Sequence, residues 1–347
     1  MKIEKIILNE ERNASLTAYL LGVKGDYGHI AKRPGIVVIP GGGYQNCDDR
    51  EADPIAMCYA KAGYQTFVLR YSIKENSVWP NPLNDYNQAM KVIQEHSEEW
   101  NLYADKIAVV GFSAGGHLAA SAATMGDIRP AAAILGYAVL NEDVKKCNPS
   151  APDLIREVDS STPSCFLFAT RNDSMVPVIN SIQFMEALTK KGIVFESHIY
   201  AYGPHGFSSG DSSIIDPMQK MCKRTSNWVN DSIEFLKDVM GDFSAEGMTE
   251  PVCGQFISED YAKFLSAECT IRKVMTDPEA AIVVKEIIQK IFDAITKADK
   301  FAGSDKSVLW NMVETLKVRE FMQMGQISPE IIGEIDSKLR KVPNNRI

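Results

Sequence analysis

The stretch from Val109 to Ala120 reads VVGFSAGGHLAA. Its apolar start continues a run from Ile107 that is typical of a short buried strand, and the small residues after Leu118 are typical of a helix. Because Gly-x-Ser-x-Gly lies between the two, we expect Ser113 on a sharp strand-to-helix turn, with its hydroxyl exposed above the end of the strand. The amide of Ala114, at the helix start, is then expected to face any negative charge that develops beside Ser113.

A glycine loop near the N-terminus supports this interpretation of the pattern, which on its own also occurs by chance. The apolar run from Gly35 to Pro40 is typical of a strand buried on both faces, and it leads into GGGY at residues 41–44. These glycines could form a plain tight turn. Their position after an early strand favours an oxyanion hole, in which the amides of Gly42 and Gly43 join that of Ala114.

A serine hydroxyl is a poor nucleophile, so it needs a base and a carboxylate that orients the base. In a sheet of this type the chain order is Ser, then Asp or Glu, then His, each in a loop after a strand. The five histidines are His29, His96, His117, His198 and His205. His205 alone lies in a loop after the last expected strand, so we predict that it is the base. His117, one turn along the helix after Ser113, is predicted to be a packing residue with local hydrogen bonds.

The predicted carboxylate is Asp173, which directly follows the expected strand at 163–170. The alternative role for Asp173 is to cap the helix that follows it. Asp143, Asp153 and Asp159 are rival carboxylates, but all three lie in the irregular polar segment 141–161, which we expect to form a short lid.

Strands and helices alternate along most of the chain, which predicts an α/β fold with a doubly wound, mostly parallel sheet. The first two strands are expected to be antiparallel edge strands. The expected strands cover 2–8, 16–21, 35–40, 65–71, 107–110, 131–140, 163–170 and 194–200. The expected helices cover 53–62, 84–100, 118–124, 179–191 and 227–240.

Composition limits the classes of function. The 347 residues are 45% hydrophobic and 24% charged, with a formal net charge of −8 and no basic stripe, which argues against nucleic-acid binding. The first ten residues are too charged for a signal peptide, and no apolar run reaches the length of a membrane span. The seven cysteines are scattered without metal-ligand spacing or a disulfide framework. We therefore expect a cytoplasmic protein with reduced thiols, no metal, no cofactor and no membrane partner.

Five motifs together resemble those of α/β-hydrolase esterases of the acetylxylan esterase and feruloyl esterase type. They are PGGGY at 40–44, WPxPLxD at 79–85, DKIAVVGFSAGGHLAA at 105–120, NDxxVP at 172–177 and GPHGF at 203–207. The resemblance covers about residues 15–240, and it implies a triad of Ser113, Asp173 and His205, which matches the choice made from the residues. Pro40 stands where many relatives carry histidine, which suits the carbohydrate-esterase branch.

The function that we expect is an intracellular serine carboxylic ester hydrolase. It would remove acetyl groups from short oligosaccharides such as xylo-oligosaccharides through an acyl-enzyme, with Tyr44 and Trp79 stacking on the substrate. Because these two side chains suit an aromatic acid equally well, a feruloyl or general short-chain esterase is the alternative. A carbohydrate-binding or scaffold protein with a relic active site is the non-enzymatic alternative.

The pattern changes after about residue 245, where strand-like stretches stop. Four helices are expected, over 258–269, 278–300, 306–324 and 329–341. We therefore predict a catalytic domain at 1–243 and a small, all-helical domain at 244–347, which contains no histidine. Its last part faintly resembles a helical tail on some bacterial glycoside hydrolases. We expect this domain to cover the catalytic domain or to form a homo-oligomer rather than to bind sugar directly.

Overall fold

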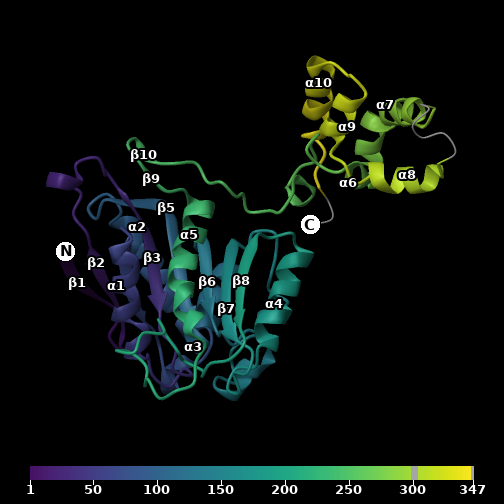
Figure 1. Cartoon of the computed structure of the whole chain (residues 1–347). Helices are drawn as coiled ribbons and strands as arrows, with labels where there is room; N and C mark the ends of the chain where they lie inside the picture. Colours follow the sequence, from purple (N-terminus) through teal and green to yellow (C-terminus); the bar gives the residue numbers. More distant parts are fainter. Residues whose placement is uncertain (298–303, 345–347) are drawn as a thin grey trace. The chain divides into compact units, whose positions relative to one another are not determined.

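The computed structural model describes residues 1–297 and 304–344, and the chain divides into two compact units, Met1–Gln255 and Phe256–Ile347 (Figure 1). The division lies after the boundary predicted at residue 243. A small hairpin of β9 (Phe243–Ser244) and β10 (Gly247–Met248) follows the last helix of the first unit. The chain then stays bonded to that unit, because the amide of Val194 donates to the carbonyl of Gln255 at 2.9 Å.

The first unit is built on one eight-stranded sheet, whose order is β1-β2-β4-β3-β5-β6-β7-β8. The strands are β1 (Lys2–Asn9), β2 (Ala14–Leu20), β3 (Arg33–Ile39), β4 (Gln65–Arg70), β5 (Leu102–Phe112), β6 (Ala132–Gly136), β7 (Ser164–Thr170) and β8 (Phe195–Tyr200). The pairs β1–β2 and β2–β4 are antiparallel and all others are parallel, which confirms the predicted fold class. Only β1 of the first two strands is an edge strand, because β2 pairs with β4 on its other side.

Helices cover the sheet (Figure 1). They are α1 (Asp53–Lys61), α2 (Asn81–Glu95), α3 (Ser113–Met125), α4 (Ile179–Lys190) and α5 (Trp228–Met240). The core cluster joins α1 and α5 to the strands through side chains that include Ile55, Tyr59, Trp228 and Leu236. In the part of the chain that the structure describes, no helix combines the length and the apolar character needed to cross a membrane.

The second unit has its own core and five helices within the described residues. They are α6 (Ile271–Thr276), α7 (Pro278–Thr296), α8 (Lys306–Val313), α9 (Val318–Met324) and α10 (Pro329–Leu339). The helix predicted at 258–269 is wrong, since that stretch holds only a 3₁₀ turn at Glu259–Tyr261. Residues 298–300 of the helix predicted at 278–300 lie outside the described residues.

The helix predicted at 306–324 is broken in two by long-range pairing. Thr270 and Lys317 form an antiparallel bridge, in which the amide of Ile271 donates to Leu316 (2.9 Å) and that of Val318 donates to Cys269 (3.0 Å). Thr270 precedes the short helix α6, which is followed by the longer helix α7. Lys317 precedes the short helix α9, which is followed by the longer helix α10. Both longer helices begin at a proline. The second unit is therefore built from two similar halves, and the pairing of their backbones interrupts the helix that local pattern alone favours.

A buried carboxylate on α2 ties together three segments of the first unit. Asp85 is fully buried, and it accepts hydrogen bonds from the amide of Ser72 (2.8 Å), after β4, and from the guanidinium of Arg12 (2.6 Å), in the β1–β2 turn. Since a buried amide without an acceptor is costly, this contact stabilises the packing of α2 on the sheet.

We expect Asp85→Ala to destabilise the protein by roughly 1–3 kcal/mol, because the Ser72 amide loses its acceptor while the partly exposed Arg12 returns to water. Urea unfolding followed by circular dichroism measures this. Asp105→Ala, which removes an exposed carboxylate on β5, is the control and should change the free energy of unfolding by less than about 0.5 kcal/mol. Equal effects of the two variants would contradict the assignment.

Candidate active site

Ser113 is the first residue of α3, directly after the end of β5. Its φ of +52° lies in the left-handed region, which is strained for a residue with a side chain. The turn forms because α3 begins in close contact with the end of β3. A Cβ on Gly115 would lie only 2.3 Å from the carbonyl oxygens of Ile39 and Pro40, so only glycine fits there.

His205 lies in the loop after β8, and its Nε2 is 2.9 Å from the Oγ of Ser113. On the other side of the ring, Nδ1 is 2.7 Å from Oδ2 of Asp173, in the loop after β7. A hydrogen on Nδ1 that is donated to Asp173 leaves Nε2 free to accept the serine proton. The structure therefore brings together the three residues that the sequence selects, in one hydrogen-bonded line.

The Asp173 side chain is almost fully buried, with an exposed fraction of 1%. Its Oδ1 accepts hydrogen bonds from the amides of Met175 (2.9 Å) and Val176 (3.0 Å), which fix the carboxylate within its loop. These amides precede α4, which begins at Ile179, so Asp173 orders the loop and does not cap that helix. The rival carboxylates bond elsewhere: Asp143 to Lys146, Asp153 to its own loop and Asp159 to Arg129.

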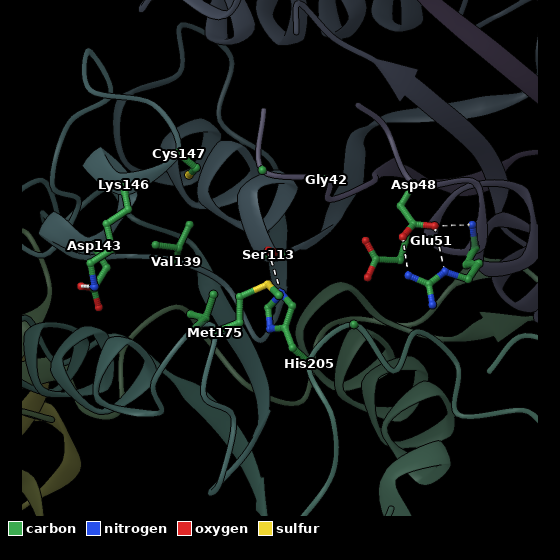
Figure 2. A pocket seen from close by; sticks show the side chains of 14 residues that line it. Gly42, Asp48, Glu51, Ser113, Val139, Asp143, Lys146, Cys147, Met175 and His205 are labelled. Carbon is green, nitrogen blue, oxygen red and sulfur yellow. Dashed lines mark hydrogen bonds and ion pairs between the residues drawn. The ribbon is translucent and has the colours of Figure 1, made fainter. Parts of the chain in front are cut away.

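The three residues lie beside a cavity of about 470 Å³, which Ser113 and His205 help to line. Figure 2 shows Asp48 and Glu51 on one side of Ser113 and His205, and Asp143, Lys146 and Cys147 on the other. Val139, Met175 and Val176 add apolar surface. The cavity thus combines apolar surface with charged side chains in its walls.

The glycine loop forms part of the same cavity. Gly42 (φ +127°) and Gly43 (φ +61°) both line it, and in the described part of the chain neither amide has a hydrogen-bond acceptor. Ala114 is the second residue of α3, where helix amides have no acceptor within the helix. A Cβ on Gly42 would lie 2.2 Å from the carbonyl oxygen of Asn46, so glycine is required at that position. The oxyanion hole itself stays a prediction.

The prediction that Tyr44 contacts substrate is wrong. Tyr44 is fully buried, because with a φ of +59° it follows two glycines that turn the chain inward, and its hydroxyl lies 2.7 Å from Nδ1 of His117. Trp79 is half-buried, its ring packs edge-on against that of His117, and it is not among the residues that line the cavity. Its contact with substrate stays a prediction.

The sequence did not reveal the charged walls of the cavity. Arg50 pairs with Asp48 (2.6 Å) and Lys146 pairs with Asp143 (2.6 Å). The second pair belongs to the segment predicted to be a lid, which forms a 3₁₀ turn at Glu142–Lys146. Glu51 was also missed, since one glutamate in a polar stretch carries no pattern. Among the residues that the structure describes, no three His, Cys, Asp or Glu side chains converge as metal ligands do.

His117 is a buried packing residue, as predicted, but its hydrogen bonds are to residues far away in the sequence and not local as expected. Its Nδ1 is bonded to Tyr44 and its Nε2 lies 2.9 Å from the carbonyl oxygen of Pro152, an arrangement that suits the neutral ring. Burial lowers the pKa of His117 to about 4.

We therefore expect the free energy of unfolding to fall as the pH drops from about 6.5 towards about 4, by up to about 3 kcal/mol from His117 alone. In this pH range His117 is protonated in the unfolded chain, while in the folded chain it stays neutral. Urea unfolding between pH 7 and 4.5 should show a smaller loss for His117→Gln than for the wild type. His29→Gln, at an exposed position, should keep the wild-type loss, and an identical loss in His117→Gln would contradict the assignment.

This chain is similar to several known proteins. The BD-FAE family model matches residues 27–154. Endo-1,4-beta-xylanase B of Butyrivibrio fibrisolvens is 33% identical over 208 residues, which are 51% of this chain and 33% of the relative. Acetylxylan esterase of Xylanibacter ruminicola is 29% identical over 198 residues, which are 50% of this chain and 41% of the relative. The chain thus spans less than half the length of these two relatives.

One solved structure is matched by this chain over nearly the whole length of that structure. It is MGS-M1, an α/β hydrolase enzyme from a Medee basin deep-sea metagenome library, with 40% identity and a TM-score of 0.65. The match covers 69% of this chain and 98% of that protein. The chain therefore belongs to the α/β-hydrolase family, and within it resembles the esterases of the acetylxylan esterase and feruloyl esterase type.

Proposed function

We propose that this protein is a serine esterase that uses Ser113, His205 and Asp173 as its catalytic triad. The observation that carries the proposal is the hydrogen-bonded line from Ser113 through His205 to Asp173 beside a cavity. The strained backbone of Ser113 costs stability, and the two amides that bond Asp173 constrain its loop. A purely structural site requires neither feature.

The reaction follows from this arrangement. Nε2 of His205 takes the proton of Ser113 as its Oγ attacks the ester carbonyl, and the amides of Gly42, Gly43 and Ala114 stabilise the oxyanion. The protonated His205 then gives its proton to the leaving alcohol as the C–O bond breaks. Water attacks the acyl-enzyme with His205 again as the base, which releases the acid and restores Ser113.

We propose acetylated short oligosaccharides as the substrate class. The apolar area around Val139 and Val176 suits a small acyl group, while the ion pairs of Arg50 and Lys146 offer donors and acceptors to sugar hydroxyls. One similar protein bears the name acetylxylan esterase, and another is a xylanase. An aromatic acyl group such as ferulate is the second candidate, because Met175 is 70% exposed beside the cavity and thioethers pack well on aromatic rings.

We further propose that the protein works in the cytoplasm and that its second unit joins copies of the chain. All seven cysteines are free thiols, as expected of a protein in a reducing compartment. Light scattering tests whether the second unit joins copies of the chain. A particle with the mass of a monomer would contradict that proposal.

The substrate proposal is tested by the acid released from acetylated and feruloylated xylo-oligosaccharides. We expect rapid release of acetate by the wild type, and a fall in kcat of about 10⁶-fold in Ser113→Ala, because the nucleophile is lost. Ferulate release alone would favour the second candidate. Activity on neither, with Ser113 still labelled by a fluorophosphonate, would contradict the substrate and keep the esterase, while absence of labelling would contradict both.

A separate prediction concerns Asp173. In Asp173→Asn the amide no longer accepts the Nδ1 proton as a carboxylate does, so the ring favours the tautomer that cannot take the serine proton. We expect kcat to fall by about 10⁴-fold with KM little changed. Steady-state kinetics on a chromogenic acetate ester measures this, and Asp153→Asn, in the segment after the cavity wall, is the matched control that should keep wild-type kcat.

A further inference from the structure

One buried carboxylate beside the cavity has no part in the reaction described above. Glu51 lies at the end of a 3₁₀ turn, Asp49–Glu51, that follows the glycine loop, and it is only 2% exposed (Figure 2). Its Oε2 accepts a hydrogen bond from the amide of Gly41 at 2.8 Å, and its Oε1 accepts one from the hydroxyl of Tyr137 at 2.5 Å. Both oxygens are therefore used, and by groups from different parts of the chain.

Tyr137 extends this contact to the histidine loop. It directly follows β6, is almost completely buried, and packs edge-on against the His205 ring with centroids 5.1 Å apart. Its hydroxyl accepts a hydrogen bond from the amide of Ser208 at 3.0 Å. Ser208 lies three residues after His205, with a φ of +48°, a conformation that depends on its surroundings. The tyrosine hydroxyl thus bonds Glu51 on one side and the loop of the proposed base on the other.

Ser208 is held at all of its polar groups. Besides the bond from its amide to Tyr137, its hydroxyl donates to the carbonyl of Arg50 at 2.6 Å, and its carbonyl accepts from the indole of Trp228 at 2.8 Å. Arg50 directly precedes Glu51, so the turn that carries Glu51 is joined to the histidine loop directly through Arg50 and indirectly through Glu51 and Tyr137.

We propose that Glu51 is a positioning residue that holds the glycine loop and the histidine loop in one fixed arrangement, through Gly41 on one side and through Tyr137 and Ser208 on the other. The inference rests on the proposed function, because the two loops carry the oxyanion donors and the base of that reaction. Gly41 directly precedes Gly42 and Gly43, so a shift of its amide moves the proposed oxyanion donors relative to Ser113.

The chemistry of the link requires a carboxylate. Burial raises the pKa of Tyr137, so its hydroxyl keeps its proton and donates it to Glu51. Burial also raises the pKa of Glu51, while the bonds from Tyr137 and Gly41 oppose this by favouring the charged form. A glutamine has one acceptor oxygen. If that oxygen accepts from the Gly41 amide, the NH₂ group faces Tyr137 and the tyrosine proton loses its acceptor, and if it accepts from Tyr137, the NH₂ group faces the Gly41 amide. The volume is then kept, but residue 51 no longer accepts both bonds.

The first test is Glu51→Gln, assayed in the full chain with two readouts. These are steady-state kinetics on an acetate ester and the rate at which a fluorophosphonate labels Ser113. Because a displacement of about 1 Å in a catalytic group costs on the order of 10²-fold, we expect kcat and the labelling rate to fall together by roughly 10- to 100-fold. KM should stay within about twofold. A loss of folded protein would also lower the apparent kcat at unchanged KM, but it would reduce the extent of labelling at Ser113 and leave the labelling rate constant of the folded molecules at the wild-type value.

The second variant, Tyr137→Phe, removes the hydroxyl and keeps the ring beside His205. It should lower kcat and the labelling rate as Glu51→Gln does. The double variant should lose little more than either single one, because both interrupt the same link. Tyr59→Phe is the matched control, since its fully buried hydroxyl bonds Ser232 between α1 and α5, and it should keep the wild-type kcat.

The outcomes separate the two proposals. Wild-type kcat and labelling in a folded Glu51→Gln or Tyr137→Phe would overturn the positioning role while leaving the esterase intact. Losses that add fully in the double variant would overturn the link through Tyr137. A wild type that neither hydrolyses esters nor reacts at Ser113 would overturn the proposed function, and the inference with it.

Discussion

The whole site depends on a backbone contact that tolerates no side chain. The start of α3 lies so close to the end of β3 that a Cβ on Gly115 would overlap the carbonyls of Ile39 and Pro40. This contact puts the glycine loop, which continues β3, directly beside Ser113, which begins α3. A left-handed residue costs of order 1–2 kcal/mol, so the turn persists only because the buried strand and helix on either side of it are fixed by the core.

The groups around Ser113 are held by hydrogen bonds between loops rather than by the sheet. Asp173 is fixed by two amides of its own loop, and the loop of His205 is fixed at Ser208 by the first turn after the glycines, by Tyr137 and by Trp228. Loops that carry chemistry are commonly the mobile part of a fold. Here the polar groups of these loops are hydrogen-bonded across the ends of neighbouring strands. The loops are therefore already ordered, and binding of a substrate has to remove less of their conformational entropy.

The sequence predicts those parts of the protein that local pattern determines. The strand–turn–helix around Ser113 and the glycines after β3 are continuous in the chain, and His205 follows by elimination from five histidines. The orientation of Tyr44 could not be predicted, because it depends on the positive φ angles of the loop. The pairing of Glu51 with Tyr137 joins residues far apart in the sequence, and neither residue type carries a pattern of its own.

The same reason explains the errors in the second unit. The stretch from Lys306 to Met324 has helical periodicity, yet the backbone at Leu316 and Val318 bonds the segment around Ile271. Local preference for helix is a small term per residue, and long-range backbone pairing overrides it. The unit therefore repeats one motif, a short helix followed by a helix that begins at a proline. The spacing of apolar residues alone did not show where these helices begin and end.

The ion pairs in the cavity walls contribute little to stability, and in the proposed function their part is recognition of the substrate. Arg50 and Lys146 are half or more exposed, and pairs of this kind are worth about 0–1 kcal/mol. Each also pairs with a residue two or three positions away in a short turn, and Asp143 in addition accepts a hydrogen bond from Asn180 in α4 at 3.1 Å. What they do is line the approach to Ser113 with donors and acceptors whose charges cancel within each pair. Such walls favour a neutral, hydroxyl-rich alcohol over a charged one, which is the character of the sugar in the proposed substrate.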